Sequence, residues 1–319
     1  MPSPDVIDAF NAAHEAADYY VVAKPGYVAF SGETRRGYLQ RQTTNDLDLL
    51  SRTQALPSLL TAATGRILEY FLLIDEGEAV GMLTQPGHGP GLAAYFQKRV
   101  FFNDKVTIED RSAHWAQVEL HGPPAGRVLT EIGISSIPNL DGVATGTLDG
   151  EQTAAIGISG YSANLAFLVL LPATVLEVLV ERLAQLSIAP LDFPAREVLR
   201  IEAGLAGDPE FQNEYTPFEL GLDRLVSPVK GCYTGQEVLA RQVTYDKVVR
   251  QLVRIRASAP LEAGAAIYAD GKTIGSITSS ALSPRSGPVA LGLVRKPHDR
   301  PGTSLAIQQN SRAESATVV

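Results

Sequence analysis

The sequence predicts an α+β protein, in which a larger N-terminal region of sheets and helices precedes a small antiparallel β-barrel. Three observations predict this class. Short apolar segments are followed by proline and a helical segment, strand pairs are separated by turn residues, and helical periodicity disappears after Lys247. The predicted domains are residues 1–246 for the α+β region and 247–319 for the barrel.

Composition and charge exclude several classes of protein. The chain has 319 residues, enough for about two domains, and its 27 basic and 35 acidic residues give a net charge of -8. A net negative chain is not expected to bind nucleic acid in general. The single cysteine excludes an intrachain disulfide and fits a reducing compartment.

Hydropathy and the N-terminal residues predict the cellular location of the protein. The most apolar segment, Leu165 to Leu171, is far shorter than the roughly 20 residues that span a membrane, and the first twenty residues do not resemble a secretory signal. We therefore expect a cytoplasmic protein without a membrane partner.

The sequence of the N-terminal region predicts alternating helices and strands. Ile67 to Ile74 and Ala79 to Leu83 resemble two strands of a hairpin around Glu76-Gly77. Further expected elements are a helix over Asp5 to Tyr20, a strand over Tyr27 to Ser31 and a helix after Gly37.

A weak repeat follows, in which a strand, one or two prolines and a helix come in that order. The strands are Val80 to Leu83, Gln117 to Leu120 and Ala166 to Leu171. Proline is tolerated in a first helical turn because the N–H that it lacks would be unpaired there. Such units predict helices packed on mostly antiparallel sheets.

The C-terminal region has short apolar runs every eight to twelve residues, separated by Gly, Pro, Ser and Asp. Asp270-Gly271 lies between two such runs and predicts a tight hairpin. These features indicate a small β-barrel.

The segment Lys230-Gly231-Cys232-Tyr233-Thr234-Gly235-Gln236-Glu237 carries the chemistry. Thr234 and Glu237 match a capping box, which predicts a helix from Gly235, with Tyr233 packed on the first turn. Cys232 then lies near the positive end of that helix and near Lys230. Both favour the thiolate, so we expect an exposed, reactive cysteine. Gly231 permits a positive φ or a close backbone approach. The alternative is a cysteine in a capped turn without a function.

A second candidate site is Glu202, in Leu199-Arg200-Ile201-Glu202-Ala203-Gly204. Asp192 predicts the start of a helix and Gly204 its end, so that Glu202 lies in the last turn, where the helix dipole opposes a carboxylate. A ligand with paired N–H donors, such as an aminopyrimidine ring, would stabilise this charge. An ordinary salt bridge would do so as well.

Two other patterns do not predict a functional site. The five histidines show no metal-ligand spacing, so no metal is predicted. Gly87 to Gly91 is glycine-rich but lacks the lysine of a phosphate loop, and it predicts a turn before a helix.

At these residues the sequence resembles the aminomethyltransferase T-protein of the glycine cleavage system, and more closely its YgfZ-type relatives. The resemblance covers nearly the whole chain and ends in the string Lys230 to Glu237, which is typical of the YgfZ branch. Other matching segments are Thr44-Asn45-Asp46, Gly65-Arg66-Ile67, Arg200 to Gly204 and Pro217 to Asp223.

The resemblance implies a ring of α+β subdomains around a central folate cavity, closed by the C-terminal barrel. It also implies that tetrahydrofolate or a one-carbon derivative is the cofactor and that Glu202 binds its pterin ring. We assign Tyr70, Asn45, Gly231 and Tyr233 to the same folate site. Cys232 and Lys230 are the candidate catalytic residues.

One departure separates this chain from aminomethyltransferases, which carry an aspartate pair after the Gly-x-Ile segment. Glu69-Tyr70 stands there instead. The longer glutamate side chain moves the carboxylate by about an Å or more, and misplacement on that scale costs about a hundredfold in rate. In a strand Glu69 and Tyr70 face opposite sides, so only one can reach the cavity. We expect the transferase activity to be lost or changed.

Three functions follow from this reading. The first is a folate-binding accessory factor for the assembly or repair of iron–sulfur proteins, linked to tRNA modification and acting through Cys232. The second is a tetrahydrofolate-dependent aminomethyltransferase or demethylase, and the third is a non-catalytic interaction module. The sequence leaves open whether the chain is an enzyme, which client it serves, its oligomeric state, and whether Cys232 faces the cavity or the outer surface.

Overall fold

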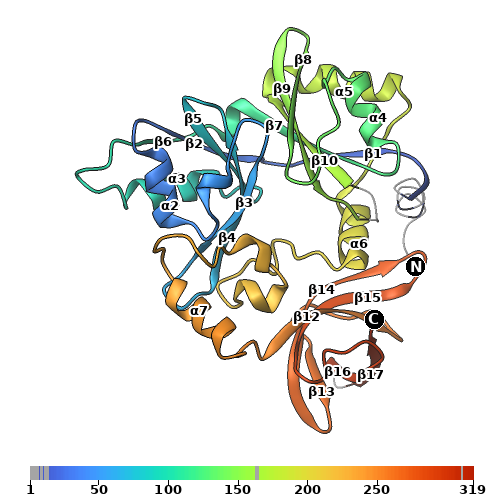
Figure 1. Cartoon of the computed structure of the whole chain (residues 1–319). Helices are drawn as coiled ribbons and strands as arrows, with labels where there is room; N and C mark the ends of the chain where they lie inside the picture. Colours follow the sequence, from blue (N-terminus) through green and yellow to red (C-terminus); the bar gives the residue numbers. More distant parts are fainter. Residues whose placement is uncertain (1–6, 8–9, 11–13, 162–164, 310–311) are drawn as a thin grey trace.

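The computed structural model describes residues 7, 10, 14–161, 165–309 and 312–319. It contains two mixed α+β lobes, a connecting region and a barrel (Figure 1). The predicted helix over Asp5 to Tyr20 falls partly outside the described residues; positions 7, 10, 14 and 15 are helical, whereas Asp18 to Val21 form a strand. The prediction therefore extended that helix too far.

The first lobe is a five-stranded antiparallel sheet in the order β3-β4-β5-β2-β6, with two helices on one face. The strands are β2 (Gly26–Ser31), β3 (Leu56–Thr61), β4 (Ile67–Asp75), β5 (Ala79–Thr84) and β6 (Thr107–Asp110). The helices are α2 (Arg35–Gln42) and α3 (Gly89–Gln97), and η1 (Leu47–Leu49) follows α2. The predicted hairpin of β4 and β5 is confirmed.

The second lobe is a six-stranded sheet in the order β11-β1-β7-β10-β9-β8, in which β1 and β11 pair in parallel and the other neighbouring strands pair antiparallel. Its strands are β1 (Asp18–Val21), β7 (Trp115–His121), β8 (Val143–Leu148), β9 (Glu151–Ser159), β10 (Leu165–Pro172) and β11 (Ala189–Pro190). Helices α4 (Ala125–Glu131) and α5 (Leu176–Gln185) cover one face, and η2 (Ser112–His114) and η3 (Ala173–Val175) are single turns.

The two sheets pack against each other through their inner faces. Tyr27, Leu72 and Leu83 of the first sheet lie in one buried cluster with Ile156 and Leu170 of the second. The helices cover the outer faces because apolar side chains alternate along the strands and both faces must be buried. The strand, proline and helix repeat is confirmed in β5–α3, β7–α4 and β10–α5.

A connecting region links the lobes to the barrel and carries most candidate site residues. It comprises α6 (Phe193–Ala203), η4 (Pro217–Leu220), η5 (Asp223–Leu225) and α7 (Gln236–Thr244). In Figure 1, α6 lies between the second lobe and the barrel, and α7 lies beside the first lobe, so that the chain runs around a common centre. The predicted start of α6 at Asp192 and its end at Gly204 are confirmed.

The barrel is closed by six antiparallel strands in the order β12-β15-β14-β13-β16-β17. These are β12 (Arg250–Ala257), β13 (Ala266–Ala269), β14 (Lys272–Ser283), β15 (Gly287–Arg295), β16 (Ser304–Gln309) and β17 (Arg312–Val318). Asp270 and Gly271 join β13 to β14 with positive φ at both positions, as the predicted tight turn requires. The predicted fold class is thus confirmed. No helix in the described part of the chain could cross a membrane.

Candidate functional site

Cys232 lies in an irregular segment before α7, and its side chain is exposed. The predicted capping box is wrong: Thr234 makes no cap hydrogen bond, and the cap residue is Gly235 in the left-handed conformation. A side chain at Gly235 would meet the carbonyl oxygen of Ala62 at 2.5 Å, so only glycine fits there. The helix therefore begins at Gln236, one residue later than predicted, and Cys232 precedes the cap by three residues.

Lys230 is buried, and its ammonium group binds the backbone rather than lying free in solvent. Nζ donates to the carbonyl oxygens of Thr43 at 2.6 Å and Asn45 at 2.8 Å. Burial lowers the pKa of Lys230 to about 8, an effect that the nearby carboxylate of Asp46 opposes. Lys230 thus fixes the segment that carries Cys232 to the end of α2.

Asn45, like Lys230, uses its side chain to bind backbone carbonyl groups. Its side-chain amide donates to the carbonyl oxygens of Pro57 at 2.9 Å and Arg224 at 3.4 Å. Lys230 and Asn45 therefore lie together, and Asn45 links α2 to β3 and η5.

Tyr233 and Gly231 flank Cys232 in different surroundings. Tyr233 is buried against Phe218 and Leu239, and burial raises its pKa to about 12. No heavy atom lies within 4 Å of a Cβ built at Gly231, and the positive φ considered there occurs at Gly235 instead. Gly231 therefore has no steric need for glycine.

Glu69 and Tyr70 point to opposite sides of β4, as predicted. The buried carboxylate of Glu69 accepts from the backbone N–H of Gln85 at 3.2 Å and contacts Nδ1 of His88 at 2.7 Å. Burial raises the pKa of Glu69, and the bond to His88 opposes that shift. His88 is half-exposed, and its Nε2 lies 3.9 Å from Oδ1 of Asp208. The three side chains form an acid–base cluster.

Tyr70 stacks on Phe211, with ring centroids 5.0 Å apart. Burial raises the pKa of Tyr70 to about 12. Its hydroxyl lies in the field of Arg224 and Asp141, which form an ion pair of 2.6 Å. Because the carbonyl of Arg224 also accepts from Asn45, η5 connects the surroundings of Tyr70 with those of Lys230.

Glu202 lies at the end of α6 against the barrel. Its Oε1 accepts from the Ser283 hydroxyl at 2.5 Å, and its Oε2 lies 3.1 Å from Arg285. The salt bridge that the sequence allowed therefore exists. A carboxylate has about four acceptor positions, and these two contacts use only part of them, although the Glu202 side chain is only 9% exposed. Within the described ranges, Glu202 and Tyr70 make no hydrogen bond or ring contact with the segment Lys230 to Tyr233.

Sequence reasoning missed His88, Asp208 and Phe211. His88 was read as part of a turn before a helix, which it is: it precedes α3 as the cap residue. The signal that could have found it is its place in the short turn after β5, the neighbour of β4, because a side chain there can reach the adjacent strand where β4 begins. No sequence pattern pointed to the loop after α6, which supplies the other two.

Two family models match most of the chain, and the segment 231–249, which contains Cys232, lies between them. The family model described as "GCVT N-terminal domain" matches residues 3–230, and that described as "Glycine cleavage T-protein C-terminal barrel domain" matches residues 250–319. A chloroplastic protein of Arabidopsis thaliana, named as a transferase, is 28% identical over 96% of this chain and 73% of its own length. An aminomethyltransferase of Thermosynechococcus vestitus is 27% identical over 98% of this chain and 86% of its own.

Among solved structures, the glycine cleavage system aminomethyltransferase T from Bartonella henselae has the same fold. It superimposes with a TM-score of 0.86 at 22% identity, covering 98% of this chain and 88% of the other. The predicted superfamily is confirmed, whereas the YgfZ branch stays a prediction. The cytoplasmic location also stays a prediction, since one similar protein is chloroplastic.

Proposed function

This chain belongs to the glycine cleavage T-protein family, and from that premise we propose that it binds tetrahydrofolate or a one-carbon derivative of it. The observation that carries the proposal is that the two family models match residues 3–230 and 250–319, and that the barrel contacts the carboxylate of Glu202 through Ser283. The residues present fit the cofactor. Glu202 keeps free acceptor positions for paired N–H donors, and the stacked rings of Tyr70 and Phe211 offer an aromatic surface for a pterin.

The chemistry that we propose first is one-carbon transfer of the T-protein type, with the folate as carrier. The names of the similar proteins, aminomethyltransferase and transferase, support this function better than a role in iron–sulfur assembly. Glu69 and Tyr70 replace the aspartate pair of those enzymes. Since the carboxylate of Glu69 is buried against His88, the group that a ligand would meet is the half-exposed imidazole, with Glu69 orienting it.

A second function is supported by the exposed thiol of Cys232. In this reading the chain is an accessory factor for iron–sulfur proteins, of the YgfZ type, with a link to tRNA modification. The supporting observation is an accessible sulfur in a segment that Lys230 anchors to the α2 end. One cysteine cannot hold a cluster alone, so Cys232 would act on a ligand or on a client protein.

Calorimetry with tetrahydrofolate tests the cofactor. We expect saturable binding by the wild type and a loss of about tenfold or more in Glu202→Gln, which keeps the side-chain shape but loses the charge. Glu181→Ala, at an exposed glutamate of α5, is the matched control and should bind as the wild type does. Absence of binding by the wild type would leave only the interaction module.

Two further experiments separate the chemistries. Folate-dependent ammonia release from an aminomethylated carrier should be lost in His88→Ala and kept in His114→Ala, an exposed histidine elsewhere. Recovery of iron–sulfur enzyme activity in a deletion strain tests the accessory function. If Cys232→Ser restores that activity fully, the thiol has no part in it; if the wild type shows no ammonia release, the transferase function is wrong.

A further inference from the structure

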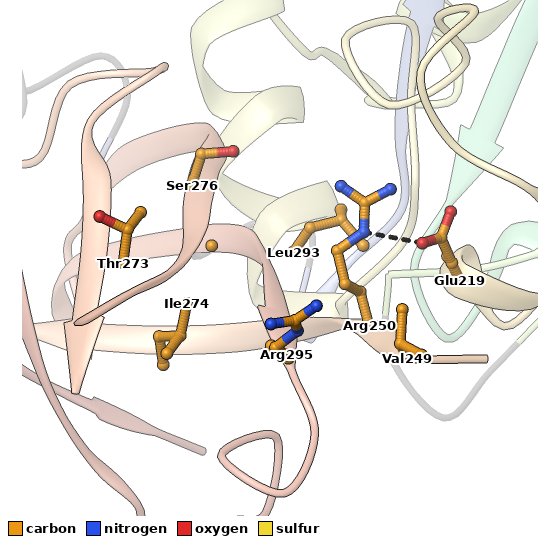
Figure 2. Close-up of a pocket in the computed structure, with 9 residues that line it drawn as sticks. Glu219, Val249, Arg250, Thr273, Ile274, Ser276, Leu293 and Arg295 are labelled. Carbon is orange, nitrogen blue, oxygen red and sulfur yellow. Dashed lines mark hydrogen bonds and ion pairs between the residues drawn. The ribbon is translucent and has the colours of Figure 1, made fainter. Parts of the chain in front are cut away.

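A pocket of about 430 Å³ lies where the connecting region meets the barrel, and none of the residues assigned to the folate site lines it. Its walls come from η4, the first residues of β12, and strands β14 and β15 (Figure 2). Two arginines, Arg250 and Arg295, line it together with one carboxylate, Glu219. Counted as formal charges, the pocket carries +1 in a chain whose net charge is -8.

Strand pairing places the two arginines next to each other. Arg250 and Arg295 are directly opposite each other in the antiparallel pair of β12 and β15. Side chains in this relation start only about 5 Å apart, and like charges there destabilise the pair. An anion between the two guanidinium groups would turn this repulsion into attraction.

Glu219 does not fill that role completely. Its Oε1 accepts from Nε of Arg250 at 2.7 Å, whereas its Oε2 is held by the N–H and the hydroxyl of Thr216 at 2.9 and 3.3 Å. Nη1 and Nη2 of Arg250, and the guanidinium group of Arg295, have no hydrogen-bond partner in the described part of the chain. Figure 2 shows the dashed bond from Arg250 to Glu219, with Arg295 beside it on the neighbouring strand.

The other lining residues indicate what kind of molecule would carry the anionic group. Thr273 and Ser276 bring hydroxyl groups, which can donate to an oxyanion, and Leu293 and Ile274 bring apolar surface. Arginine forks match the geometry of a carboxylate or a phosphate, and they are less strongly hydrated than lysine. The pocket therefore combines an oxyanion position with an apolar wall.

We propose that this pocket binds a small organic anion, with its carboxylate or phosphate between Arg250 and Arg295 and its apolar part against Leu293. The pocket shares no lining residue with the proposed folate site, so this proposal does not depend on whether the chain binds folate. Carboxylate and phosphate ligands share the chemistry that the two arginines recognise, and the probes below distinguish them.

Calorimetry without folate tests the site with phenyl phosphate, benzoate and neutral benzyl alcohol, which share one apolar ring. We expect saturable binding of at least one anion and none of benzyl alcohol; the anion that binds more tightly identifies the preferred group. Arg295→Gln should weaken the binding by about tenfold or more. This arginine is exposed and its guanidinium group has no partner among the described residues, so the variant should fold as the wild type does.

Arg256→Gln is the matched control, because Arg256 is another exposed arginine on β12 and lies outside the pocket. It should bind the anion as the wild type does. A second variant, Arg250→Gln, removes the other guanidinium and should also weaken binding by about tenfold or more. The proposal is wrong if neither anion binds the wild type, or if Arg295→Gln and Arg256→Gln bind equally well.

Discussion

Asp18 is a buried carboxyl group whose two oxygens have no hydrogen-bond partner among the described residues. It lies on β1 with an exposure of 1%, directly opposite His121 on β7. Burial raises the pKa of Asp18 to about 6, and the charge of His121 opposes that shift less strongly. At neutral pH the ionised, buried Asp18 therefore lowers the free energy of unfolding, which an aspartate on the surface would not do.

Asp18→Asn should stabilise the protein at pH 7 by up to about 3 kcal/mol, since one pKa unit corresponds to about 1.4 kcal/mol. The folded state holds this proton up to about pH 6, whereas the unfolded chain releases it near the ordinary aspartate pKa of 3.8. Wild-type stability should thus fall as the pH rises from about 4 to 6, and the variant should lose this dependence. Urea unfolding between pH 4 and 7 measures both.

The control for this prediction is Asp270→Asn, at an exposed aspartate in a turn where Asn-Gly is equally favourable. It should leave the stability at pH 7 within about 0.5 kcal/mol of the wild type. A wild-type curve that is flat from pH 4 to 6 would contradict the role of Asp18.

At the scale of an element, α7 is held by its first residues rather than by a capping side chain. The Thr61 hydroxyl donates to the carbonyl oxygen of Thr234 at 2.6 Å, and Gly235 packs against the turn at Ala62 and Gly65. The position of the Cys232 segment therefore depends on a close approach of two backbones.

Gly235→Ala should cost about 2 kcal/mol or more, because φ is 87° and the new Cβ would meet the Ala62 carbonyl oxygen at 2.5 Å. Gly231→Ala, four residues earlier, is the matched control; its Cβ would enter open space, and its cost should stay below about 0.5 kcal/mol. The free energies of unfolding in urea compare the two. Equal costs would mean that the approach at Gly235 does not constrain the segment.

Elements with local signals could be predicted from the sequence, and those set by distant contacts could not. Asp192 and Gly204 mark α6 correctly because capping is a local effect. Thr234 and Glu237 fit a local pattern as well, but the backbone of Ala62 selects Gly235 as the cap residue. A competing tertiary contact overrode that signal.

The sequence also predicted some features of the candidate site and not others. The sequence predicted the exposure of Cys232 and the opposite faces of Glu69 and its neighbour. It did not predict that Lys230 is buried on backbone carbonyls or that His88 contacts Glu69. These contacts join residues 19 to 187 positions apart, and no local periodicity encodes them.

At the scale of the molecule, α6 fixes the barrel to the lobes through a buried ionic network. Arg200, on α6, binds Glu210 at 3.0 Å in the loop after the helix and the Ser279 hydroxyl of β14 at 2.9 Å. Glu210 is fully buried, and it accepts from Ser279 and from the N–H of Gly207 as well. The proposed folate ligand Glu202 lies on the same helix, so this network positions it against the barrel.

Arg200→Met should destabilise the protein by about 3–5 kcal/mol, because it leaves the carboxylate of Glu210 buried without its cation. Removing the charge on both sides should cost less: Arg200→Met combined with Glu210→Gln should recover part of the loss. Urea unfolding measures the stability, and limited proteolysis of the native protein reports whether the barrel separates from α6. A double variant as unstable as the single one would show that packing around Arg200, and not the unpaired charge of Glu210, holds this junction together.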